Sequence, residues 1–269
     1  MTAPRSFDHI VVVVRDLDAA AARYEALGFT LTPRAQHPDH MGTSNRLAQF
    51  ANQTFIELLE IDRPETCAPH GDTFFSFGQH AQSFLSEGEE GMAMMVFAGQ
   101  NAPTDAADFA EAGFGAFAPF DFGRKATLPD GEIVEVGFSL AYALPPGLGR
   151  VGFFTCHNHF PQNFWKPAFW EHANGATGMT EIYLCVSDPE AHRADLELLT
   201  GAPARPVTGG LAYQGGPEQQ MHLISPERVT QLTGLSDIQV PGFAGVGLTG
   251  MRGPLIAPAD ASGLFLRPL

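Results

Sequence analysis

The chain has 269 residues, a formal net charge of −15 and 44% hydrophobic residues. Its length exceeds an average domain of about 150 residues, so two or three structural units are expected. The acidic balance argues against a nucleic-acid partner or an anionic membrane surface, because both attract Lys and Arg. No apolar run approaches the roughly 20 residues that span a bilayer.

Cysteine and phenylalanine usage narrow the class of protein further. Cys67, Cys156 and Cys185 are too few and too scattered for a disulfide framework or a Cys-based zinc site, so we expect a cytoplasmic protein. Phenylalanine occurs 22 times, against 2 Trp and 4 Tyr. Because Phe has no polar group, these rings are expected to line cores or an apolar pocket.

One order of elements occurs three times along the chain. An apolar run is followed by a polar residue and an amphipathic or Ala-rich stretch, which ends in Gly. Each run of about seven apolar residues predicts a buried strand. Asp16, Asp188 and, less well, Thr104 are placed to cap the helix that follows. The three copies span residues 8–28, 93–113 and 180–201.

A strand-rich stretch follows each predicted helix, so each copy has the order βαβββ. This predicts an α+β fold of about three βαβββ modules whose curved mixed sheets pair. The strands expected after the helices are residues 29–34, 44–50, 54–61, 116–122, 133–143, 151–157, 206–213 and 219–224. Residues 245–248 and 264–266 are expected to add strands at the end.

Composition shifts along the chain predict its domain boundaries. A Pro- and Gly-containing linker separates the first two copies, and a connector with four aromatic residues separates the last two. Such a long aromatic connector is expected to pack down as a lid or a wall. The expected division is a first module over residues 5–62, a linker with a short helix over 63–90, a second module over 91–160, the aromatic connector over 161–178, and a third module with C-terminal strands over 179–269.

The first copy carries an ordered set of motifs. His9 lies on the first strand, D-x-D-x-A-A starts the helix, and Gly-Phe follows it. The HP…GT-x-N segment runs from His37 to Asn45, and I-E-L places Glu57 on the fourth strand. In this order and spacing the motifs resemble the opening module of a glyoxalase-like domain of the vicinal-oxygen-chelate superfamily. The resemblance implies paired βαβββ modules that form a U-shaped, partly open barrel around a small-molecule site.

The resemblance also implies a metal site. In the family, the first and last strands of each module each supply one ligand to a divalent metal, which chelates two neighbouring oxygens of the substrate. His9 and Glu57 match these positions in the first module. Imidazole and carboxylate suit Fe, Mn, Ni, Co or Zn. Two isolated ligands do not hold a catalytic metal, so the alternative is a hydrogen-bonded core histidine and a structural glutamate.

The other two copies complete this site in different ways. In the second copy Met94 corresponds to His9, and Cys156 or His157 corresponds to Glu57. If modules one and two form the barrel, the site has an open corner. In the third copy the matching residues are Glu181 and His222. If modules one and three pair, the metal ligands would be His9, Glu57, Glu181 and His222, a complete set.

Polar groups in apolar surroundings are candidates for substrate binding. Asn45, Arg46 and Arg124 meet this description, and an arginine there can bind a carboxylate or an enolate. A surface salt bridge is the alternative for either arginine. His157 and His159 share one side of an extended strand, where two imidazoles can share a metal or flank a ligand. Alternatively, one of them is exposed and the other hydrogen-bonded.

These features leave two hypotheses for function. The first is a metal-dependent lyase, isomerase or dioxygenase acting on a small, oxygenated, partly apolar molecule. The second is a metal-free protein that binds and sequesters a small molecule, as some resistance proteins of the superfamily do, and Met94 supports it. Sheet edges left by an odd number of modules also predict a homodimer.

Overall fold

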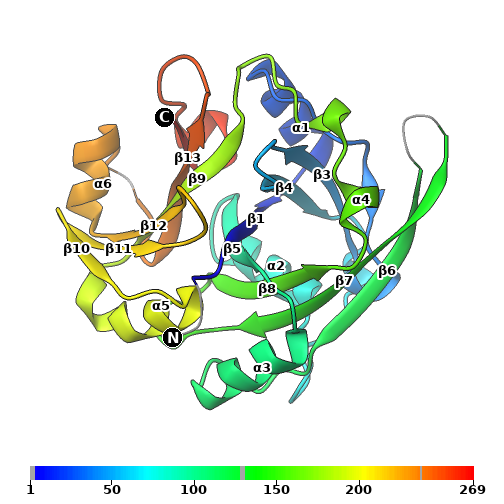
Figure 1. Cartoon of the computed structure of the whole chain (residues 1–269), viewed down its shortest axis with the longest axis horizontal. Helices are drawn as coiled ribbons and strands as arrows, with labels where there is room; N and C mark the ends of the chain where they lie inside the picture. Colours follow the sequence, from blue (N-terminus) through cyan, green and yellow to red (C-terminus); the bar gives the residue numbers. More distant parts are fainter. Residues whose placement is uncertain (1–3, 128–130, 237) are drawn as a thin grey trace.

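The computed structural model describes residues 4–127, 131–236 and 238–269, and these residues form two mixed sheets packed against one another (Figure 1). The eight-stranded sheet contains β1 (Phe7–Val14), β2 (Ala35–Gln36), β3 (Thr43–Gln49), β4 (Phe55–Ile61), β5 (Gly91–Ala98), β6 (Phe120–Thr127), β7 (Ile133–Ala143) and β8 (Gly152–Asn158). The six-stranded sheet contains β9 (Gly178–Cys185), β10 (Arg205–Val207), β11 (Gly210–Gln214), β12 (Gln220–Ile224), β13 (Gly242–Thr249) and β14 (Phe265–Pro268). The expected α+β fold of βαβββ modules in curved mixed sheets is confirmed.

The strand order decides which modules pair. The eight-stranded sheet runs β2-β3-β4-β1-β5-β8-β7-β6, with β1 and β5 antiparallel at its centre. The first strands of modules one and two are therefore neighbours, and these two modules form one sheet. In the six-stranded sheet, β9 of module three pairs in the same way with β13, and β13 pairs in parallel with β14. The two C-terminal strands thus act as a reduced fourth module.

The helices cover both faces of this arrangement. They are α1 (Leu17–Ala26), α2 (Phe77–Ser86), α3 (Ala102–Glu111), α4 (Pro161–Phe164), α5 (Arg193–Thr200) and α6 (Pro226–Thr233). Asp16 caps α1 by accepting from the Ala19 amide, as the sequence predicts, whereas Asn101 rather than Thr104 caps α3. Asp188 accepts from the Glu190 amide and caps a short 3-10 turn before α5. No helix among the described residues is long and apolar enough to cross a membrane.

Three strand predictions differ from the structure. Residues 206–213 belong to two strands, β10 and β11, joined by a turn. Residues 29–34 are extended but form no strand, and β2 comprises only Ala35–Gln36. Pro33 lies in this stretch and has no N–H to donate to a ladder. Residues 116–119 likewise precede β6, and Pro119 ends that irregular stretch. In both places proline delays the start of strand pairing.

A common core joins the two sheets. Alternate residues of β1 and β9, such as Ile10 and Ile182, belong to it together with apolar side chains of α1, α3 and α5. Hydrogen bonds also link the halves, since the Met179 amide donates to Thr54 Oγ1 at 3.1 Å. We call the face of each sheet turned away from this core its open face. Helix α2 packs on the open face of the eight-stranded sheet, and α6 on that of the six-stranded sheet.

His80 on α2 should make the stability of the protein depend on pH. It is 8% exposed, and its Nε2 has no hydrogen-bond partner among the described residues. Burial lowers the pKa of His80 from 6.5 to about 4. The unfolded chain therefore binds a proton at this residue below about pH 6.5, whereas the folded protein does so only near pH 4.

We expect this difference to cost about 3 kcal/mol of unfolding free energy as the pH falls from about 6.5 to 4. Urea unfolding of the wild type and of His80→Gln at several pH values in this window measures it. The variant should show a shallower pH dependence, because its side chain does not titrate. Parallel pH profiles would contradict the assignment of this loss to His80.

Candidate functional site

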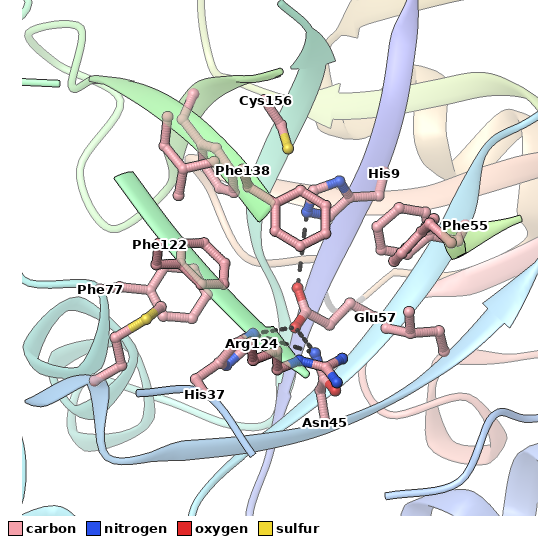
Figure 2. A pocket seen from close by; sticks show the side chains of 15 residues that line it. His9, His37, Asn45, Phe55, Glu57, Phe77, Phe122, Arg124, Phe138 and Cys156 are labelled. Carbon is pink, nitrogen blue, oxygen red and sulfur yellow. Dashed lines mark hydrogen bonds and ion pairs between the residues drawn. The ribbon is translucent and has the colours of Figure 1, made fainter. Parts of the chain in front are cut away.

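A small pocket with a cavity volume of about 60 Å³ lies on the open face of the eight-stranded sheet (Figure 2). Its walls come from both modules, from α2 and from the connector. The phenylalanines that line it are Phe55, Phe77, Phe122, Phe138, Phe154 and Phe164. The titratable and amide side chains that line it are His9, His37, Asn45, Glu57, Arg124 and Cys156. Part of the chain's high phenylalanine content therefore lines an apolar pocket.

His9, His37, Asn45, Glu57 and Arg124 form what we call the polar wall of the pocket, and Glu57 lies at its centre. Its carboxylate is 4% exposed, and Asn45 Nδ2 donates to Oε1 at 2.6 Å. His9 Nε2 lies 3.7 Å from Oε2, and His37 Nε2 lies 3.7 Å from Oε1. Within the sheet β4 lies between β3 and β1, so Glu57 has strand neighbours that carry Asn45 and His9. His37 comes from the loop after β2. A single carboxylate is thus held between two imidazoles.

Asp8 determines how His9 faces the pocket. Asp8 Oδ1 lies 2.5 Å from His9 Nδ1 and accepts its proton. This contact turns the opposite ring nitrogen, Nε2, toward Glu57. The ring is held in place by stacking on Phe55 with centroids 4.2 Å apart. The His9 ring nitrogen and the Glu57 carboxylate thus lie side by side, 3.7 Å apart, at the pocket surface.

His37 is the neutral member of the polar wall. Asn45 Nδ2 lies 3.3 Å from its Nε2, and Thr43 Oγ1 lies 2.9 Å from its Nδ1. Burial lowers the pKa of His37, while Glu57 opposes this effect and Arg124 adds to it. His37 therefore accepts a hydrogen bond from Asn45 through Nε2 and donates one to Thr43 through Nδ1–H. This arrangement fixes the amide that holds Glu57.

Arg124 enters the pocket from β6, near Glu57 and His37 (Figure 2). It makes no hydrogen bond and no ion pair with any residue in the described part of the chain. Burial lowers the pKa of this guanidinium, and Glu57 opposes that effect. A partly buried guanidinium without hydrogen-bond partners carries a desolvation cost that an anionic ligand would offset.

The opposite wall supplies no metal ligand. The local two-fold relation between β1 and β5 passes through the pair Ile10–Met95 and exchanges His9 with Met94. Glu57 pairs with Val11, which lies two residues after His9. Phe154 likewise pairs with Val96, which lies two residues after Met94. Met94 and Phe154 are therefore the second module's counterparts of His9 and Glu57. The sequence pattern placed Cys156 or His157 at the last position, two or three residues too late.

The donor set does not fit a resident divalent metal. No group of three or more His, Cys, Asp or Glu residues is arranged to hold a metal ion within residues 4–127, 131–236 and 238–269. Cys156 reaches the pocket, but burial, followed by Asp8 and Glu57, raises the pKa of its thiol well above the usual range. It is therefore a neutral thiol rather than a thiolate ligand.

Comparison with known families agrees with this architecture. The profile of the glyoxalase-like domain family matches residues 7–200, which is most of the chain. The protein belongs to the glyoxalase-like domain family. Its fold is that of the vicinal-oxygen-chelate superfamily. No curated protein matches the sequence.

Solved structures resemble this glyoxalase-like protein at low sequence identity. A hypothetical protein from Staphylococcus aureus superposes with a TM-score of 0.73 and 12% identity, covering 98% of this chain and 99% of that one. A triple mutant of 4-hydroxymandelate synthase from Streptomyces coelicolor has a TM-score of 0.54 and 12% identity, covering 92% of this chain and 71% of that one. Methylmalonyl-CoA epimerase from Streptomyces coelicolor covers 58% of this chain at 17% identity and a TM-score of 0.39. At these identities the first two likenesses show the fold alone.

The four residues expected to share one metal are divided between the sheets of the glyoxalase-like protein. His9 and Glu57 lie in the pocket of the eight-stranded sheet. Glu181 and His222 lie on the open face of the six-stranded sheet, where they line a different pocket. The set does not assemble because β1 pairs with β5, so module three is turned away on the other side of the common core.

The residues expected to bind substrate also separate. Asn45 and Arg124 line the pocket. Arg46 points to the opposite face of β3, where it donates to Thr32 O at 2.9 Å and forms an ion pair with Glu25 at 2.8 Å. Its interpretation as a surface salt bridge therefore fits the structure. Successive residues of a strand face opposite sides, so Asn45 and Arg46 cannot both reach one pocket.

His157 and His159 lie outside the pocket. Their rings are 4.5 Å apart, and Ser139 Oγ lies 2.7 Å from His159 Nε2 and also donates to Asp121. Cys156 faces the pocket, so the neighbouring His157 faces the other side of β8. The two imidazoles thus belong to a surface cluster rather than to the polar wall.

The aromatic connector forms one wall of the pocket, as the sequence predicts. Phe164 lines the pocket, and its carbonyl accepts from Gln49 Nε2 at 3.0 Å. His172 Nδ1 accepts from the Thr30 amide, and its Nε2 donates to Gln49 O at 2.7 Å. Both contacts tie the connector to the first module. These hydrogen bonds hold the connector in place as a wall of the pocket. The amino-acid composition of the connector did not reveal them.

Proposed function

We propose that the glyoxalase-like protein binds a small, largely aromatic or apolar molecule carrying an anionic oxygen group, and transfers a proton on it with Glu57 and His9. The observation that carries this proposal is Arg124, a partly buried guanidinium without a hydrogen bond or ion pair in the described part of the chain, set among phenylalanines. Its fork of donors suits a carboxylate or an enolate. The six phenylalanines suit the apolar body of the molecule.

The approach to the pocket also suits an anion. A groove that shares Asn45 and Arg124 with the pocket carries Lys125 and Lys166 on its walls. Neither lysine forms an ion pair with a residue of the described ranges. In a chain of net charge −15, a cationic entrance is a local exception to the overall field. Such an entrance raises the local concentration of an anionic ligand.

The polar wall supplies the parts of a proton transfer. Glu57 removes a proton from the carbon next to a carbonyl, and Arg124 stabilises the oxygen anion that forms. His9, whose Nε2 lies 3.7 Å from Glu57 Oε2, then takes the proton on from Glu57, while Asn45 holds the carboxylate in place. Returning the proton to a different atom completes an isomerisation. This chemistry uses only groups that line the pocket.

We predict that the protein works without a resident metal. Purified without chelators, it should carry well below one equivalent of Fe, Mn, Ni, Co or Zn, because its second module offers Met94 and Phe154 in place of ligands. Elemental analysis and melting curves with each added metal measure this. Stoichiometric metal that is lost in His9→Ala and Glu57→Ala would restore the metal-dependent lyase, isomerase or dioxygenase as the better hypothesis.

Phenylpyruvate is a suitable probe, because it joins an aromatic ring to a carboxylate and has an exchangeable carbon-bound proton. We expect saturable binding by calorimetry and weaker binding of its neutral methyl ester. In D₂O, proton NMR should show enzyme-dependent loss of the exchangeable methylene signal. Binding without exchange would instead favour the second candidate, a metal-free sequestering protein, which the apolar second-module wall also suits.

The homodimer and the cytoplasmic location stay predictions. The sheets end in the edge strands β2, β6, β10 and β14, and of these β14 is partly covered by a bridge between Leu266 and Ile256. The other edges offer backbone groups to a second copy. Light scattering of the purified protein measures the state directly, and a monomer at all concentrations would contradict the dimer.

A further inference from the structure

The open face of the six-stranded sheet repeats the geometry of the first pocket. Glu181 lies two residues before Tyr183, and Tyr183 pairs with His222. In the first pocket His9 lies two residues before Val11, and Val11 pairs with Glu57. The local two-fold relation between β9 and β13 passes through the pair Ile182–Val246 and gives Gly245 as the counterpart of Glu181. By the same relation, the counterpart of His222 is the residue that pairs with Gly247, two residues after Gly245. That partner is Arg267.

The second half of the protein therefore carries Glu181, His222 and Arg267 at three of its four site positions. Arg267 Nη1 lies 3.1 Å from Glu181 Oε2 and donates to Tyr183 Oη at 2.6 Å. Tyr183 in turn donates to Glu181. A fixed guanidinium at the fourth position repels a metal cation, so this site cannot take the divalent ion that the first-module pattern suggests.

Glycine leaves room for this cluster. A Cβ at Gly247 would lie 2.8 Å from the Glu181 Cβ and 2.9 Å from its Oε2. Any larger residue at this position would displace the carboxylate from Arg267. The opening beside Glu181 is thus built into β13.

Two arginines of this pocket remain without a charged partner in the described part of the chain. The His222 ring lies at the base of the pocket with its Nε2 buried, 3.7 Å from Glu181 Oε1. The Arg205 side chain on β10 donates a hydrogen bond to Gln220 at 3.2 Å, and the Arg228 side chain on α6 donates one to Gln231 at 3.4 Å. Neither arginine has a carboxylate partner in the described part of the chain. Three guanidinium groups thus line a pocket with one carboxylate, Glu181, which is already paired.

We propose that this pocket is a second binding site, which takes a small oxyanion (a carboxylate or phosphate group) between Arg205 and Arg228, beside the His222 ring. The arginines supply charged N–H donors that match the oxygens of either group. His222 stacks on Tyr183, with centroids 4.7 Å apart and planes 11° apart, which holds its ring at the base of the pocket. The site is independent of the first pocket, because the common core separates the two open faces.

The test follows the His222 ring by NMR in the full-length, isotope-labelled protein. Sodium phosphate and sodium succinate are titrated separately at constant ionic strength. We expect a saturable shift of the His222 ring signals below about 10 mM of one or both anions. Saturation by phosphate alone identifies a phosphate site, and saturation by succinate alone identifies a carboxylate site.

Matched arginine variants decide whether the shift reports this pocket. Arg228→Ala and Arg205→Ala should each weaken the anion by about tenfold, the usual scale for one charged hydrogen bond. Arg193→Ala, which removes an exposed arginine of the same half that pairs with Glu190, should leave the affinity unchanged. Arg124→Ala should also leave it unchanged, so the outcome is separate from that of the first pocket. The absence of saturation with both anions, or equal loss in Arg193→Ala, would overturn the proposal.

Discussion

Arg124→Ala is expected to weaken phenylpyruvate binding by about 100-fold, which corresponds to about 3 kcal/mol. The loss is large because a partly buried carboxylate would be left among phenylalanines without its charged partner. The melting temperature should stay constant or rise, since Arg124 makes no hydrogen bond or ion pair with the described residues. Calorimetric titration and a melting curve of the same sample give both values.

Arg46→Ala is the matched control for this variant. Arg46 lies on β3 next to pocket residue Asn45, but its side chain binds Thr32 and Glu25 on the opposite face. It should therefore keep full affinity and lose a little stability. If both variants lost affinity equally, the effect would come from net charge, and Arg124 would not be the anion-binding group.

Glu57→Gln is expected to slow deuterium exchange of phenylpyruvate by about 10²- to 10⁴-fold, the usual contribution of a general base. Gln keeps the side-chain length and an oxygen that accepts from Asn45 Nδ2, so the pocket should keep its shape. Affinity should change much less than the exchange rate. Proton NMR in D₂O follows the exchange, and calorimetry follows the binding.

Glu60→Gln controls for the loss of a carboxylate from the same strand. Glu60 lies three residues further along β4 and forms an ion pair with Arg34 at 2.6 Å, outside the pocket lining. Its exchange rate should match that of the wild type. Undiminished exchange in Glu57→Gln would mean that another group removes the proton, and His9 would be the next candidate.

Local patterns in the sequence determined most of the module structure. The apolar run of β1, the Asp16 cap and the three-strand stretch that follows describe one βαβββ unit without reference to distant residues. The same patterns placed His9 and Glu57 on the first and fourth strands of that unit. Strand alternation could also have separated Asn45 from Arg46, because neighbours on a strand face opposite sides, yet both were predicted to bind substrate and the structure divided them.

The tertiary structure alone decided which modules share a site. Three similar copies allow more than one pairing, since the hydrogen bonds that join β1 to β5 involve backbone groups, which every strand offers equally. This pairing put Met94 and Phe154 opposite His9 and Glu57, and it turned Glu181 and His222 toward a separate pocket. It also brought Arg124, remote in sequence, to the polar wall. Sequence thus determined the residues of each unit, and long-range packing determined which of their charges meet.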